Sequence, residues 1–279
     1  MNGDFMAYIM IEGPEGAGKT EGAARLFAGI KSAGYDVMVN HEPGNGTLGT
    51  LVRATLSGIK KHDYERLKSF IRDGSEIELL LDHLTSNEYR GPKVIDTIKS
   101  DYSTIKGLIH DDTVFDKLLE SMSAANKIDV ESLQLLFTAV RSEDMKRLKP
   151  FLERRDMAVI SDRGYPSTIT YAESSGPNKA YADFLKLINS RFPKPDKLFI
   201  LYAPPEILLK RVQQRGGIEE RFDKLESIRN ISDSYRRNFP DAFYIDASQS
   251  REKVYEELFN ETMRVLNKLG VSPVYKTAD

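Results

Sequence analysis

Short apolar runs alternate along the chain with longer segments in which apolar residues recur every three to four positions. Short runs bounded by turn residues are typical of buried strands, and the longer periodic segments predict helices. We expect strands at residues 7–11, 35–40, 157–161, 198–202 and 242–246. We expect helices at residues 21–30, 130–152, 181–190, 205–215 and 251–269. Because strands that alternate with helices in this way form a parallel sheet with both faces covered, the pattern predicts a three-layer α/β fold.

This alternation stops between residues 59 and 127. Apolar residues there predict several short amphipathic helices and no strand, at about 64–71, 77–84, 94–109 and 114–122. Eleven basic and fourteen acidic residues lie between positions 57 and 130, which argues against an arm that binds DNA or RNA. We therefore expect one domain over residues 1–279, with a helical insertion at about 59–127.

The composition of the 279-residue chain narrows the classes of function. A net charge of −2 gives no overall field that would favour nucleic acid or an anionic membrane surface. The absence of cysteine excludes disulfides, thiolate zinc sites and cysteine nucleophiles. No apolar run approaches the roughly 18 residues of a membrane span, and the N-terminus lacks the basic region of a signal peptide. We expect a cytoplasmic protein.

Residues Gly13–Thr20 match the phosphate-loop pattern G-x-x-x-x-G-K-[ST] without a mismatch. The match lies between a predicted strand and a predicted helix, which is the context that this loop requires. Glycines let backbone N–H groups and the helix N-terminus surround phosphate oxygens. Lys19 is expected to reach the β- and γ-phosphates, and the Thr20 hydroxyl to hold Mg²⁺. The alternative is a glycine turn that only joins a strand to a helix, but the complete motif favours binding of a nucleoside triphosphate.

Two further groups of polar residues carry weaker indications. Asp162 follows a predicted strand, where open α/β sheets place ligand groups, and would either hold Mg²⁺ or cap a turn. A basic cluster near a Gly-Gly pair forms either a mobile lid or a solvated helix face. The cluster consists of Lys210, Arg211, Arg215 and Arg221, around Gly216-Gly217.

Several segments, taken in order, resemble the thymidylate kinases, a family of nucleoside monophosphate kinases. The phosphate loop has an acidic residue, Glu15, as the family's loop does. Glu42-Pro43-Gly44, followed by Arg53, resembles the family's E-P-G-G-T…R segment, whose arginine binds the monophosphate. Residues 135–141 (LLFTAVR) resemble its L-L-F-x-A-x-R helix, in which the phenylalanine stacks on thymine and the arginine bonds the base.

Three later segments extend the resemblance. Asp162-Arg163 with residues 167–171 resembles the family's D-R-[aromatic] segment, although Gly164 stands at the aromatic position and Tyr165 follows it. Residues 211–216 resemble the lid, and residues 246–248 the adenine-side loop. The resemblance covers most of residues 7–56 and 130–268 and implies a P-loop kinase fold with a central parallel sheet.

The resemblance implies ATP-dependent, Mg²⁺-dependent phosphorylation of dTMP to dTDP by a homodimer. The implied catalytic residues are Lys19, Glu15, Arg163 and Arg215. The implied ATP-binding residues are Gly13, Gly16, Ala17, Gly18, Lys19, Thr20, Arg211 and Ala247, with a lid at about 211–223. The implied dTMP-binding residues are Glu15, Glu42, Arg53, Phe137, Arg141, Arg163, Thr170 and Tyr171. The implied Mg²⁺ ligands are Thr20 and Asp162.

Other interpretations stay open at this point. Phe137 and Arg141 share a helix face, which suits a pyrimidine, but a core phenylalanine beside a surface arginine has the same spacing. The acceptor could be another or a modified pyrimidine deoxynucleotide, or a deoxynucleoside. A GTP-binding switch protein is the alternative from another class, because residues 126–129 match N-K-x-D, but the chain has no D-x-x-G segment.

Overall fold

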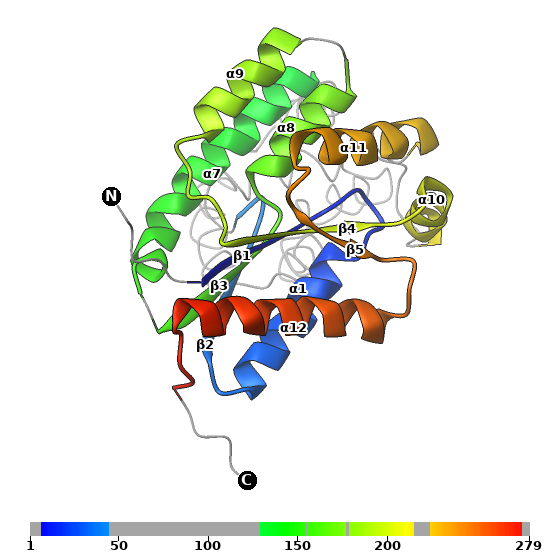
Figure 1. Ribbon diagram of the computed structural model, residues 1–279. Coiled ribbons are helices and arrows are strands. Elements are labelled where there is room, and N and C mark those ends of the chain that lie inside the picture. The colour runs from blue at the N-terminus through cyan, green and yellow to red at the C-terminus, as the bar shows by residue number, and fades with distance from the viewer. Residues whose placement is uncertain (1–6, 45–128, 155, 177–178, 215–223, 275–279) are drawn as a thin grey trace, which may run out of the picture. The chain divides into compact units, whose positions relative to one another are not determined.

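The computed structural model describes residues 7–44, 129–154, 156–176, 179–214 and 224–274 (Figure 1). The chain divides into two compact units, one formed by residues 1–44 and 130–279 and the other by residues 45–129. Apart from Asp129, the described residues all belong to the first unit. The predicted insertion at 59–127 and Arg53 therefore lie outside the described residues.

Among the described residues, five parallel strands form one sheet in the order β2-β3-β1-β4-β5. They are β1 (Ala7–Glu12), β2 (Asp36–His41), β3 (Met157–Asp162), β4 (Lys197–Tyr202) and β5 (Phe243–Asp246). All five predicted strands are confirmed, with small shifts at their ends. Ile11 of the central strand pairs with Asp162 on one side and with Phe199 on the other. The loop that follows β1 therefore leaves the sheet beside the end of β3.

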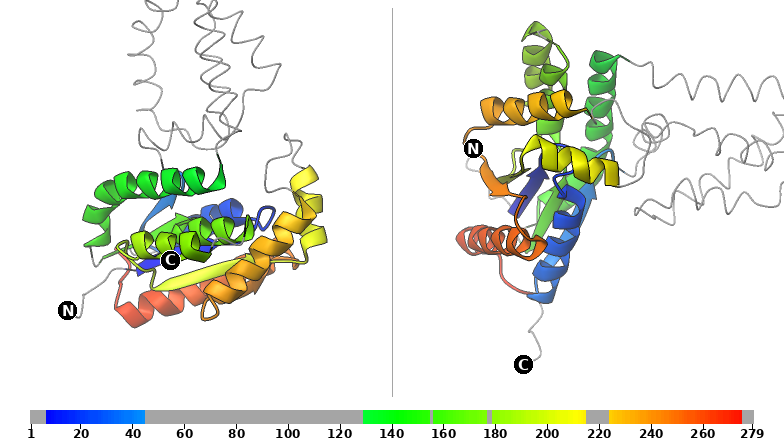
Figure 2. Two further views of the ribbon diagram at one scale, coloured as in Figure 1. Left: turned by 90° about the horizontal axis from the view of Figure 1, so that it is seen from above. Right: turned by 90° about the vertical axis from the view of Figure 1, so that its right-hand side faces the viewer.

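Helices cover both faces of this sheet, which confirms the three-layer α/β architecture (Figures 1 and 2). One face carries α1 (Lys19–Ser32) and α12 (Arg251–Leu269). The other carries α7 (Val130–Leu152), α8 (Tyr165–Ser174) and α11 (Leu225–Asn238), with α9 (Lys179–Asn189) packed on α7 and α8. The remaining helix, α10 (Pro205–Gln214), follows β4 and contacts α11.

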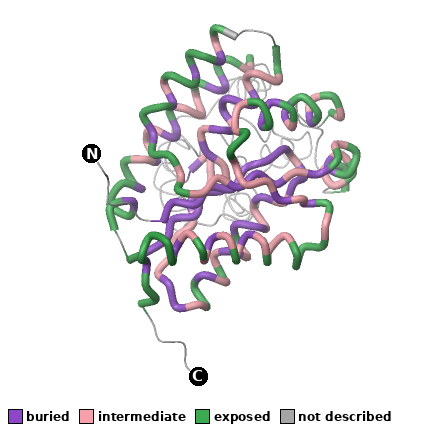
Figure 3. The backbone as a smooth tube through the Cα atoms, viewed as in Figure 1, coloured by how far each residue is buried: buried purple, intermediate pink, exposed green. Residues whose placement is uncertain are grey.

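Side chains alternate along β1 and so contribute to the core on both sides of the sheet. Ala7, Ile9 and Ile11 pack in the cluster that α1 and α12 complete, whereas Tyr8 and Met10 pack with α7. Every residue of β1 is buried, as expected for a central parallel strand (Figure 3). The alternation matters for the site because it places Glu12 on the same face of the sheet as Tyr8 and Met10.

Several helices differ from expectation. Helices α8 and α11 were not predicted from the sequence, and α9 begins at Lys179 rather than at the predicted residue 181. The predicted helix 205–215 ends at Gln214, and the lid residues 215–223, which include Arg215, lie outside the described part of the chain. Within the described residues, no helix combines the length and apolar character that crossing a membrane requires.

Candidate active site

The phosphate loop depends on three glycines with positive φ angles, which are 146° at Gly13, 79° at Gly16 and 88° at Gly18. A Cβ atom at Gly13 would lie 2.3 Å from the Leu201 carbonyl oxygen, and one at Gly16 would lie 2.5 Å from that of Leu208. A Cβ atom at Gly18 would meet no heavy atom within 4 Å. Gly18 also precedes α1 and offers no side chain to cap it. The first N–H groups of α1 are thus available to an anion.

Lys19 lies in this loop with only 5% of its surface exposed. Its ammonium group donates a hydrogen bond to the Pro14 carbonyl oxygen at 2.7 Å. Burial and the charge of Arg163 lower the pKa of Lys19 to about 8, although Glu15 and other nearby carboxylates oppose this shift. The nearby carboxylates balance the charge of the Lys19 ammonium only in part. A phosphate group bound beside Lys19 would supply further negative charge.

Thr20 and Asp162, the two predicted Mg²⁺ ligands, lie in hydrogen-bond contact. The Thr20 hydroxyl donates to Asp162 Oδ2 at 2.6 Å, and His41 Nδ1 lies 3.2 Å from the same oxygen. Burial opposes ionisation of Asp162, but the hydrogen bonds from His41 and Thr20 outweigh it and hold its pKa below the ordinary value. The other carboxylate oxygen, Oδ1, is buried and has no hydrogen-bond partner.

These oxygens fit a magnesium ion, which prefers carboxylate and hydroxyl oxygens and keeps several water molecules. The described residues contain no group of three or more His, Cys, Asp or Glu side chains that could hold a metal alone. A cation beside Thr20 and Asp162 would therefore complete its coordination with ligand phosphates and water, as in other phosphate-loop proteins.

Arg163 joins the end of β3 to the phosphate loop. Its φ angle of 70° is uncommon for a residue other than glycine. The guanidinium group contacts the Glu15 carboxylate, donates to the Tyr171 hydroxyl at 3.2 Å, and lies 5.6 Å from the centre of that ring. Burial opposes ionisation of Glu15, but the charges of Arg163 and Lys19 outweigh it and hold its pKa well below the ordinary value. Glu15 of the phosphate loop thus forms one cluster with Arg163 and Tyr171, which were predicted from a different segment.

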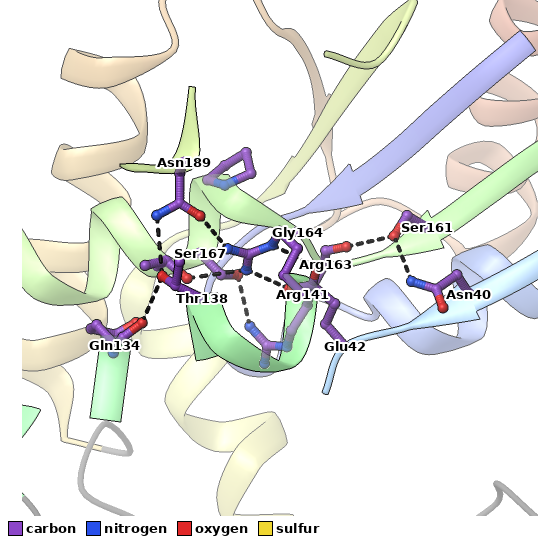
Figure 4. Close-up of polar contacts among 12 residues, drawn as sticks. Asn40, Glu42, Gln134, Thr138, Arg141, Ser161, Arg163, Gly164, Ser167 and Asn189 are labelled. Carbon is purple, nitrogen blue, oxygen red and sulfur yellow. Dashed lines mark hydrogen bonds and ion pairs between the residues drawn. The ribbon is translucent and has the colours of Figure 1, made fainter. Parts of the chain in front are cut away.

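A second cluster surrounds Arg141 on α7 (Figure 4). Arg141 Nε and Nη2 donate to the two carboxylate oxygens of Glu42 at 2.7 and 2.5 Å. Arg141 also donates to Asn189 Oδ1 at 2.5 Å and to Thr168 Oγ1 at 3.1 Å. The side chains of Arg141 and Glu42 are only 3% and 5% exposed. The sequence predicted both residues but not their pairing. It gave no indication of Asn189, and it included Thr168 only as part of the segment 167–171.

Comparison with known proteins places this chain in a family. A family model described as thymidylate kinase matches residues 11–87 and 110–258, which is most of the chain. The chain belongs to the thymidylate kinase family. A probable thymidylate kinase of Pyrobaculum aerophilum is 36% identical over 134 residues, which is 47% of this chain and 68% of that protein. Another, of Methanocaldococcus jannaschii, is 31% identical over 150 residues, or 54% of this chain and 74% of that protein. A third, of Pyrococcus horikoshii, is 24% identical over 90% of this chain and 93% of that protein.

The remaining residues that the thymidylate kinase resemblance singled out take varied places. Phe137 lies one turn before Arg141 on α7 and is partly buried. Thr170 is fully buried, and its hydroxyl donates to the Pro166 and Ser167 carbonyl oxygens of its own helix. On the ATP side, the buried Ala247 follows β5, and its N–H donates to the Tyr202 carbonyl oxygen at 2.7 Å. Ala17 is also buried, and Arg211 lies on α10.

Gly164 departs from the family's pattern, and the structure gives a packing reason. It precedes α8 in an extended conformation, and a Cβ atom there would lie 2.5 Å from Met10 Cε. Tyr165 packs instead against the cluster that contains Met10, and its ring lies 6.1 Å from that of Phe239. An aromatic residue is therefore present, one position later in the chain.

Glu12 is a further residue of this site that was not predicted from the sequence. The predicted strand stopped at Ile11 and the phosphate-loop pattern begins at Gly13, so neither pattern included it. Its carboxylate is fully buried and accepts hydrogen bonds from Gly164, Ser167 and Tyr235. An acidic residue that continues an apolar strand face is the signal that could have identified it, because buried carboxylates need partners.

Proposed function

We propose that this protein transfers the γ-phosphoryl group of ATP to dTMP and releases ADP and dTDP. One observation carries the proposal beyond family membership. Arg163, which contacts Glu15 of the phosphate loop, and Arg141, which pairs with Glu42, both contact the first turn of α8. Their partners on α8 are the adjacent residues Ser167 and Thr168. A triphosphate site and a second arginine-lined site therefore adjoin, as transfer between two nucleotides requires.

The residues of the phosphate loop would bind and neutralise the donor. Backbone N–H groups at the start of α1 and the Lys19 ammonium would contact the β- and γ-phosphates. Thr20 and Asp162 would hold Mg²⁺, which supplies positive charge to the phosphate oxygens. An oxygen of the acceptor monophosphate would attack the γ-phosphorus in line, while the bond from that phosphorus to the β–γ bridging oxygen breaks and ADP leaves. Arg163 would stabilise the charge on the transferring group.

The second cluster would bind the acceptor. Phe137 would stack on the pyrimidine, and Arg141, oriented by Glu42 and Asn189, would direct one remaining N–H of its guanidinium to the base. Arg53 would bind the monophosphate, and Glu15 would orient the deoxyribose 3′-hydroxyl. We propose that the active form is a cytoplasmic homodimer that binds nucleotides and neither nucleic acid nor a membrane.

The lid would supply a further charge. Gly16 follows Glu15, so the phosphate loop itself offers no arginine at that position. We assign this role to Arg215, which lies outside the described residues, with Arg221 as the reserve. Because an arginine in this role contributes roughly 10³–10⁵ in rate, Arg215→Ala should lower kcat about a thousandfold with little change in ATP affinity. Single-turnover rates of Arg211→Ala, Arg215→Ala and Arg221→Ala test this, and a loss below tenfold in all three would overturn it.

An ADP-release assay over a set of acceptors tests the function itself. We expect rapid release with dTMP, less with dUMP and dCMP, and little with thymidine or with no acceptor. Rapid release with thymidine would indicate a deoxynucleoside kinase, and another pyrimidine nucleotide as the best acceptor would replace dTMP. Release without any acceptor, or a preference for GTP without transfer, would support a hydrolase or switch protein.

The base-binding assignment needs its own variant. Arg141→Ala should raise KM for dTMP far more than KM for ATP, because losing a charged hydrogen bond costs roughly 1.5–3 kcal/mol. Lys149→Ala, an exposed change on the same helix, is the matched control. An unchanged KM for dTMP in Arg141→Ala would remove α7 from the acceptor site.

A further inference from the structure

The carboxylate of Glu12 lies beneath the turn that carries Arg163. Glu12 is the last residue of β1 and has no exposed surface. Oε1 accepts from the Gly164 N–H at 2.7 Å and from the Ser167 N–H at 3.2 Å. Oε2 accepts from the Ser167 hydroxyl at 2.7 Å and from the Tyr235 hydroxyl at 2.8 Å. Four donors from three residues thus converge on one carboxylate, which is about as many as an ionised carboxylate accepts.

These bonds hold Arg163 at both its backbone and its side chain. The Gly164 N–H belongs to the peptide that directly follows Arg163, so Glu12 fixes the backbone on that side. The Ser161 hydroxyl donates to the Arg163 carbonyl oxygen of the same peptide at 2.8 Å. Ser167 Oγ, which donates to Glu12, lies 3.4 Å from Arg163 Nη1 and accepts from it (Figure 4). A left-handed backbone at a residue other than glycine persists only where its surroundings fix it.

We propose that Glu12 is a positioning residue for phosphoryl transfer, which acts by aiming Arg163 at the phosphate loop. This inference rests on the proposed function, because Arg163 is there the residue that contacts the transferring group. Glu12 itself does not face the reactants, since its carboxylate is buried and all four of its contacts are protein donors. The hydroxyl of Ser167 transmits the restraint from Glu12 to the guanidinium group.

A purely structural role, the capping of α8, is the competing explanation. The N–H bonds of Gly164 and Ser167 to Glu12 would serve that role alone. Ser167→Ala separates the two explanations, because it keeps both N–H bonds and removes only the hydroxyl that links Glu12 to Arg163. Ser234→Ala is the matched control, since the Ser234 hydroxyl also bonds a glutamate, Glu173, between α11 and α8.

The first test is kinetic and compares these variants in two backgrounds. Ser167→Ala and Glu12→Gln should lower kcat roughly ten- to hundredfold with little change in KM for ATP, because misplaced catalytic groups cost rate rather than binding. Ser234→Ala should keep its kcat within about twofold of the unmodified protein. In an Arg163→Ala background, Ser167→Ala should cause no further loss, because the group it positions is already absent. An equal loss in both backgrounds, or unchanged kcat in Ser167→Ala alone, would overturn the proposal.

The second test does not depend on turnover. Restricted rotation of the Arg163 guanidinium should give separate ¹⁵N–¹H signals for its Nη groups, assigned by their absence in Arg163→Lys. Ser167→Ala should merge or broaden these signals, and Ser234→Ala should leave them unchanged. Unaltered Arg163 signals in Ser167→Ala would refute the positioning role whatever the acceptor is. Failure of the unmodified protein to phosphorylate any acceptor would instead count against the proposed function.

Discussion

The buried ion pair between Glu42 and Arg141 makes a sharp prediction about stability. Glu42→Gln keeps the size of the side chain but removes its charge, so no cavity forms and the effect is electrostatic. The guanidinium that remains is only 3% exposed and now faces a neutral amide. Of the two oxygens that accept from Arg141 at 2.7 and 2.5 Å, only one is left as an acceptor.

The expected cost follows from this burial. Removing one partner of a buried pair costs about 3–5 kcal/mol, and the remaining amide oxygen places Glu42→Gln near 3 kcal/mol. Glu206→Gln is the matched control, because Glu206 pairs with Arg229 at 3.3 Å while both side chains are more than half exposed. An exposed pair contributes about 0.2–1 kcal/mol, so the control should lose less than 1 kcal/mol.

Urea denaturation followed by far-UV circular dichroism measures both losses, and tyrosine fluorescence supplies a second probe because the chain has 13 tyrosines and no tryptophan. The slope against urea should be equal in all variants, which confirms that the same surface unfolds. Glu42→Leu combined with Arg141→Met should recover most of the loss, since an apolar pair of similar volume leaves no buried charge. If Glu42→Gln loses no more than Glu206→Gln, the pair is not buried in solution and the reasoning fails.

Three further predictions concern the site. Lys19 has a pKa of about 8, below its ordinary value of 10.5. Between these two pKa values the unfolded chain binds more protons at Lys19 than the folded protein does, so the stability contributed by Lys19 rises with pH. ATP affinity should fall over the same range, because Lys19 loses its positive charge. Calorimetry at pH 8 should therefore detect proton uptake on ATP binding, and equal heats in buffers of different ionisation enthalpy would contradict this. Gly44→Ala should lower the melting temperature and raise KM for dTMP, because its Cβ would lie 1.6 Å from Asp144 Oδ2, whereas Gly176→Ala meets nothing within 4 Å and should be neutral in both measurements. In a titration of ATP binding against Mg²⁺, Asp162→Asn should raise the Mg²⁺ concentration at the midpoint at least tenfold. An unchanged midpoint would remove this residue from the metal site.

The sequence predicted most of the sheet and the phosphate loop because both depend on local patterns. Apolar runs located the five strands. The loop glycines have positive φ angles, which favour glycine, and their spacing in the motif was enough to locate the loop. Helix α8 was missed because it begins at an extended glycine and is rich in Thr, Ile and Tyr, which favour helices little. Helix α11 has a buried stripe at Ile228, Ile231 and Tyr235, but polar residues dominate the segment and hid it.

The contacts of the candidate site were less predictable than its residues. Glu42 and Arg141 are 99 positions apart, and nothing in either segment indicates that they pair. Asn189 belongs to no motif, and Thr168 was matched only as one residue of the segment 167–171, without a role. Their contacts with the Arg141 guanidinium are known only from the structure. Polar partners of this kind are determined by tertiary packing, so a sequence pattern names the arginine and leaves its surroundings undetermined.

The convergence on Glu12 also has a consequence for biosynthesis. Glu12 is among the first residues to be translated, yet its partner Tyr235 is 223 positions later in the chain. Until α8 and α11 have been translated, burying Glu12 would leave an uncompensated carboxylate in the core, which is costly. A nascent chain therefore gains little by closing β1 into the sheet early. We expect the nucleotide site to form only after α11, which ends at Asn238, has left the ribosome, so that products truncated before this helix lack a site that could capture ATP.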